Sequence, residues 1–248
     1  MFETVFLSTG VPLANLVGGF AASNFMGKAI VLVQIASSIV AAAVIIGKNK
    51  EINSVARSSK RFLREFLAGR DVLDYYLLRK KGKLTSLELI YDRTCERMVK
   101  LLDPEMRRSV LGRQSEAENA ALSSREIELV RGVCEHTLQE EGIRIEHGMG
   151  ILATIVTASP MVGLLGTVWG VLDAFAIMGT KGTILLSEIA PAISAALVTT
   201  VVALLVAIPS AICYNYLTAK IRQLTTDMDG FADELLGRIT CEFQGGGD

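Results

Sequence analysis

The chain has 248 residues, 50% of them hydrophobic, and a mean hydropathy of +0.41, which is high for a water-soluble domain. The formal net charge is −1, with 25 Lys and Arg residues against 26 Asp and Glu residues. This balance excludes the large basic surplus of a nucleic-acid-binding domain. The four cysteines are scattered and form no CxxC pair, so we expect neither a zinc site nor a disulfide framework.

Three uncharged, apolar stretches predict membrane-spanning helices, because about 20 apolar residues cross the hydrocarbon core of a bilayer. The start of the chain lacks the basic region of a cleavable signal peptide, so we expect the first span to be retained. The expected division of the chain is an external segment 1–24, a first span 25–47, a cytoplasmic helical region 48–146, a second span 147–178, a short external loop 179–186, a third span 187–219 and a cytoplasmic helix and tail 220–248.

The placement of basic residues predicts the orientation of these spans. Of the 25 basic residues, 20 lie between Lys48 and Arg144, and Lys220 and Arg222 follow the third span directly. Cytoplasmic loops carry the excess of Lys and Arg near span ends. We therefore expect a periplasmic N-terminus and a cytoplasmic C-terminus.

The region between the first and second spans has the pattern of amphipathic helices, with apolar residues such as Val55, Phe62 and Phe66 at helical spacing. We expect three or four helices there. The 20 basic residues of 48–147 are offset by 17 acidic residues. We interpret the basic clusters as solvated faces and as anchors to membrane lipids, and we expect no nucleic acid partner. The expected fold class is therefore an all-α integral membrane protein with a helical cytoplasmic domain.

The second span contains PMVGLLGTVWG, in which small residues and one hydroxyl share a helical face. In lipid, helices associate through close backbone approach and hydrogen bonds, so small residues mark packing faces. The expected packing or pore-lining residues of this span are Pro160, Gly163, Gly166 and Gly170, and Thr167 lies on the same face.

The third span repeats this pattern. Its expected packing or pore-lining residues are Ala196, Ala203, Ala207 and Pro209, with the hydroxyls of Thr199 and Thr200 beside them. The alternative interpretation is plain helix packing, with each threonine bonded to the carbonyl four residues earlier in its own helix.

No ionisable side chain lies at mid-depth in any span, whereas Asp173 and Glu188 lie near the outer ends. Ion paths across membranes usually need an ionisable relay. If this chain conducts ions, a partner must supply the acid.

The stretches SPMVGLLGTVWGVLDAF and APAISAALVTTVVALLVAIPSAICYNYL resemble the TolQ/ExbB/MotA family of ion-driven motor subunits. The close match covers residues 147–240. A single span before the cytoplasmic region makes the chain more similar to TolQ and ExbB than to MotA.

The resemblance implies a homopentamer in the bacterial inner membrane, around a dimer of a single-span TolR- or ExbD-like partner that carries the membrane aspartate. It also allows a third, TolA- or TonB-like protein. Thr167 and Thr200 match the family's pore threonines, and Thr199 adjoins them. The implied function uses the proton motive force for Tol-Pal-type envelope integrity or for energised import. The chain itself needs no cofactor.

Two positions depart from the family pattern. Ala195 stands where a glutamate is usual, and Ala203 stands where a glycine is usual. Because hard cations take oxygen ligands, the pair Thr199–Thr200 leaves sodium open as the transported ion in place of the proton.

Two other classes of function are compatible with a helical membrane protein of this kind. One is a non-conducting membrane scaffold that organises partner proteins. The other is an enzyme, which we do not expect, because His136 and His147 have the pattern of surface or interfacial residues and Ser159 and Ser210 have no base placed near them. The sequence gives no choice between an anchoring and a packing role for Trp169.

Overall fold

The computed structural model describes residues 24–69, 72–78, 84–104, 107, 121–181 and 186–243. The predicted external segment 1–24 lies outside this part except for Asn24. Residues 182–185 of the predicted loop and 244–248 of the predicted tail also lie outside it.

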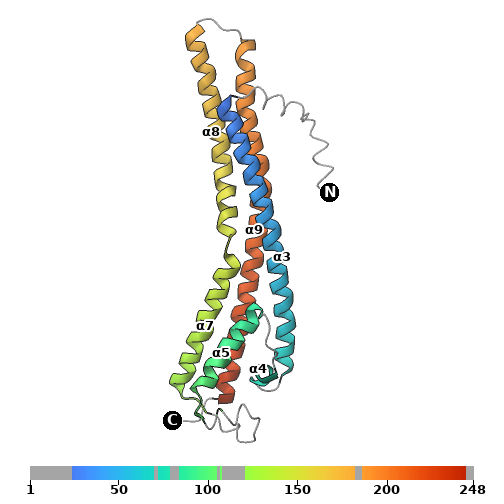
Figure 1. The fold of residues 1–248 in the computed structure, drawn as a ribbon, viewed down its shortest axis with the longest axis vertical. Coiled ribbons are helices and arrows are strands. Elements are labelled where there is room, and N and C mark those ends of the chain that lie inside the picture. Colours follow the sequence, from blue (N-terminus) through green and yellow to red (C-terminus); the bar gives the residue numbers. More distant parts are fainter. Residues whose placement is uncertain are drawn as a thin grey trace. The chain divides into compact units, whose positions relative to one another are not determined.

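The described chain is built from α-helices, which confirms the all-α fold class (Figure 1). They are α3 (Phe25–Ala68), α4 (Asp74–Leu78), α5 (Ser86–Leu101), α7 (Ser124–Glu146), α8 (Met149–Lys181) and α9 (Leu186–Phe243). The chain divides into two compact units. The first unit comprises Met1–Gly47 and Gly148–Tyr216, and the second comprises Lys48–His147 and Leu217–Asp248.

Within the part of the chain that the structure describes, three helices are long and apolar enough to cross a membrane, namely α3, α8 and α9. This number agrees with the prediction. Two of them are much longer than a span, because α3 has 44 residues and α9 has 58. The prolines Pro160, Pro191 and Pro209 all lie inside helices. Membrane helices tolerate such prolines where neighbouring groups satisfy the released backbone.

Local signals in the sequence explain where α7 begins and ends. At its start, the Ser123 hydroxyl accepts from the Glu126 N–H at 3.3 Å, and the Glu126 carboxylate accepts from the Ser123 N–H at 2.8 Å. This reciprocal pair is a capping box. At the end, Gly148 has a φ of 87°, a left-handed conformation that favours glycine and separates α7 from α8.

The second unit has its own core, which holds the helices of the charged region together. Phe62, Phe66, Tyr91 and Phe231 pack with ring centroids 5.2 to 6.2 Å apart. The Tyr91 hydroxyl, fully buried, donates to the Val72 carbonyl at 2.5 Å. This unit is therefore an independently packed helical body.

Candidate functional site

The first unit contains a seam of very close contact between α8 and α9, formed by three glycines. A Cβ atom added to Gly163, Gly166 or Gly170 would lie closer than 3.0 Å to a side chain of α9. The opposing residues are Ala203, Thr199 and Ala196, in the same order, and all three are buried. Only glycine permits this approach, which is the small-residue packing expected between helices in lipid.

The seam carries a hydroxyl that bonds from one helix to the other. The Thr200 hydroxyl donates to the Gly163 carbonyl of α8 at 2.9 Å. Thr199, 1% exposed, donates to the Ala196 carbonyl of its own helix at 2.7 Å and lies 3.3 Å from the same Gly163 oxygen. Two hydroxyls therefore converge on one carbonyl. Each hydroxyl oxygen can also accept a hydrogen bond, so the pair can contact water or a cation.

Thr167 occupies a different place. Its hydroxyl donates to the Leu164 carbonyl, three residues earlier in α8, at 2.8 Å. Its side chain lines an apolar groove with Val168, Leu172 and Phe175, which are exposed in the single chain. The seam is thus centred on Gly166, and Thr167 lies at its margin, towards an outward face of α8.

The other residues expected at the packing faces are divided between buried and exposed positions. Ala207 is buried in α9, Pro160 is half-buried in α8, and Pro209 is exposed. Ser210 is buried and donates to the Val206 carbonyl at 2.7 Å, the pattern of a hydroxyl bonded within its own helix.

A buried polar pair that the sequence reasoning did not single out links α3 to α8. Gln34 is 1% exposed, and its amide donates to the Ser159 carbonyl at 2.9 Å. The Ser159 hydroxyl donates in return to the Gln34 amide oxygen at 2.5 Å. The signal in the sequence is a lone amide in the uncharged run 29–47. Buried polar groups need such partners, so this pair fixes the register of α3 on α8.

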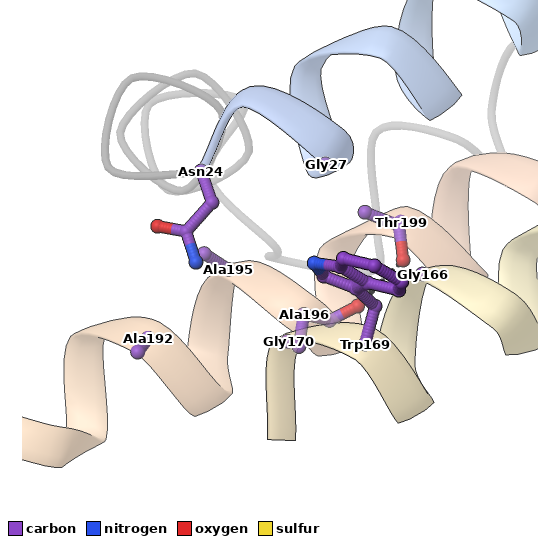
Figure 2. A pocket seen from close by; sticks show the side chains of 9 residues that line it. All are labelled: Asn24, Gly27, Gly166, Trp169, Gly170, Ala192, Ala195, Ala196 and Thr199. Atoms are coloured by element: carbon purple, nitrogen blue, oxygen red, sulfur yellow. Dashed lines mark hydrogen bonds between the residues drawn. The ribbon is translucent and has the colours of Figure 1, made fainter. Parts of the chain in front are cut away.

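Trp169 and Ala195, the residue that stands where the family usually has a glutamate, lie together at a small pocket of the first unit (Figure 2). Trp169 lines it and is 45% exposed, and Ala195 lines it and is 4% exposed. Within the described residues, no group of His, Cys, Asp and Glu side chains could hold a metal ion.

Comparison with known proteins decides the family. The sequence model of the MotA/TolQ/ExbB proton channel family matches residues 94–230, more than half of the chain and all of the seam. The chain belongs to this family. The resemblance found in the two quoted stretches is thereby confirmed.

Individual members of the MotA/TolQ/ExbB family show where the similarity lies. The Tol-Pal system protein TolQ of Haemophilus influenzae is 27% identical over 224 residues, which are 89% of this chain and 91% of that protein. The biopolymer transport protein ExbB of Neisseria gonorrhoeae is 40% identical over 96 residues, 39% of this chain and 44% of that protein. ExbB of Aquifex aeolicus is 44% identical over 84 residues, 34% of this chain and 57% of that protein. The chain therefore follows one TolQ along nearly its full length and the ExbB proteins over a shorter part.

Proposed function

We propose that this chain is the channel-forming subunit of an ion-driven motor in the bacterial inner membrane. Five copies enclose a dimer of a single-span, TolR- or ExbD-like partner, whose membrane carboxylate faces the seam threonines. The N-terminus is periplasmic and the C-terminus cytoplasmic. Ion flow drives movement of the ring about the dimer, and the partner, with a TolA- or TonB-like protein where one is present, transmits that work to the outer envelope.

The observation that carries this proposal is the Thr200 hydroxyl, directed across the seam to the Gly163 carbonyl beside Thr199. Both threonines lie in a span of α9 that has no charged residue from Ile189 to Ala219. Family membership supports a channel role for this region. Hydroxyl oxygens in such a span can replace part of an ion's hydration shell, while the partner supplies the titrating acid.

The test is ion flux through the complex of this chain and its single-span partner, reconstituted in liposomes, with proton and sodium measured separately. Thr200→Val removes the hydroxyl at nearly constant volume and should abolish flux, whereas Thr200→Ser should retain it. Thr154→Val is the matched control, because Thr154 is exposed on α8 and bonds only within its helix, to the Gly150 carbonyl at 2.9 Å. Proton flux identifies the proton as the transported ion, as we propose. Sodium flux without proton flux would identify sodium as the transported ion.

A non-conducting scaffold predicts a different outcome. In that case the assembled wild-type complex passes neither ion, and Thr200→Val leaves the phenotype of the cell unchanged. The system served is read from a deletion strain. Sensitivity to detergents indicates envelope integrity, and poor growth on scarce, receptor-imported nutrients indicates energised import.

A further inference from the structure

A pocket lies in the first unit where the start of α3 meets α8 and α9. Its lining includes Asn24, which directly precedes α3, Trp169 of α8, and Ala195 and Thr199 of α9 (Figure 2). Gly166 and Gly170 of the seam also line it. The volume is about 20 Å³. This volume has room for one water molecule, because a bound water needs a cavity of roughly 10–15 Å³ and two to four polar partners.

Polar groups stand on opposite sides of this pocket. The Asn24 amide lines one side, and the Thr199 hydroxyl, which belongs to the seam, lines another. Figure 2 shows the Trp169 ring across the pocket with its nitrogen on the side of Asn24. An indole N–H donates a hydrogen bond, an amide donates and accepts, and a hydroxyl does both. The lining therefore offers the partners that a single water requires.

A carboxylate stands beside the pocket. The Asn24 side-chain amide donates to Asp173, which is half-exposed and lies one helical turn beyond Trp169. Asp173 is the single acidic residue in the sequence of α8. A series of polar groups therefore runs from the half-exposed Asp173 carboxylate through the Asn24 amide to the pocket. The Thr199 hydroxyl, which belongs to the seam, lies at the other end of this series.

We propose that this pocket binds one water molecule that hydrates the seam, and that Asp173 attracts cations to it. The inference rests on the function proposed above and adds an access site within each copy of the chain. A negative charge at a narrow polar opening raises the local concentration of cations. Asp173 thereby increases the rate at which cations reach the seam. The bound water forms hydrogen bonds to both Asn24 and Thr199.

The first experiment separates ion access from maximal rate in the reconstituted complex. Asp173→Asn keeps the shape and the acceptor for Asn24 but removes the charge. The ion concentration at half-maximal flux should rise about fivefold, which is the ratio that corresponds to the roughly 1 kcal/mol between two unit charges at a contact separation of about 4 Å in water. The maximal flux should stay unchanged, and the effect should shrink at high ionic strength. An unchanged half-maximal concentration would overturn the role of Asp173.

The second experiment fills the pocket and does not depend on flux. Ala195→Leu places a side chain in the water site, whereas Ala190→Leu, on an exposed position of α9, is the matched control. Trp169 is the chain's one tryptophan, so its fluorescence reports on the pocket. Ala195→Leu should shift its emission to shorter wavelength and reduce its response to D₂O, and Ala190→Leu should do neither. Equal spectra for the two variants would overturn the water site.

The two proposals fail in different ways. A wild-type complex without flux of either ion refutes the motor function. The access site alone is refuted by three results together: a wild-type flux that Thr200→Val abolishes, an unchanged half-maximal concentration in Asp173→Asn, and equal spectra for Ala195→Leu and Ala190→Leu. If Ala195→Leu fails to assemble, Asp173→Asn still tests the access role of this opening, because it changes almost no packing volume.

Discussion

The closeness of the α8–α9 seam makes a quantitative prediction for Gly170→Ala. The new Cβ would lie 2.5 Å from the Ala196 Cβ and 3.3 Å from its Cα, whereas ordinary contact begins at 3.4 Å. The helices must therefore separate locally by about 0.9 Å, the difference between 3.4 and 2.5 Å. Overpacking of this kind costs about 1–3 kcal/mol, partly offset by the roughly 1 kcal/mol advantage of alanine over glycine in a helix.

The matching change on α9 should rescue this variant. Ala196→Gly removes the atom that the new side chain meets and leaves the Cα at 3.3 Å as the nearest neighbour. Each single variant should be less stable than wild type, and the double variant should be more stable than the sum of the two predicts. We expect a coupling free energy of about 1–2 kcal/mol, after modest relaxation of the seam.

The assay is reversible unfolding in mixed micelles, with the free energy of unfolding measured for all four members of the cycle. Gly150→Ala is the control on the same helix, because a Cβ there meets nothing within 4 Å. This control should be neutral or slightly stabilising. The reasoning is refuted if the two changes add within about 0.5 kcal/mol, or if Gly150→Ala destabilises as much as Gly170→Ala.

Three further predictions concern other contacts. Gln34→Leu should cost about 1 kcal/mol by leaving the Ser159 hydroxyl without its partner, and adding Ser159→Ala should recover most of that loss in the same unfolding assay. Hydrogen bonds from the Ser123 backbone and hydroxyl lower the pKa of Glu126 below its ordinary 4.5. The carboxylate therefore stabilises the fold above that pH and loses this effect as the pH falls through its folded pKa, so Glu126→Gln should flatten the acid limb of a stability–pH curve. Burial raises the pKa of the Cys95 thiol, so it should resist iodoacetamide at pH 8 until the chain unfolds, as peptide mass spectrometry would show.

The sequence was sufficient for the three long apolar helices, because charge-free length survives in a one-dimensional pattern. It was not sufficient for the detail of the seam. Gly166 and Thr167 are adjacent and differ by about 100° around the helix, and only the packing against Thr199 shows that Gly166 lies at the centre. The spacing of small residues shows which side of α8 packs closely, but only the contacts with α9 show which residue lies at the centre of that side.

Helix ends and long-range pairs were hidden for other reasons. Helices α3 and α9 continue well beyond the predicted spans, to Ala68 and Phe243. Hydropathy shows where a helix stops being apolar, but it does not show where the backbone stops being helical. The pairing of Gln34 with Ser159 joins residues 125 positions apart. No local pattern carries such a contact.

The separation of these two residues also has a consequence for how the protein is made. At about 5–20 residues per second, roughly 6–25 s of synthesis separate Gln34 from Ser159. Helix α3 therefore meets the insertion machinery before the partner of its amide has been translated. Its insertion must rely on the apolar residues around Gln34. Ser159, which is translated later, then gives α8 one polar group with which to pair against α3. The order of synthesis thereby sets the order in which these two helices pack.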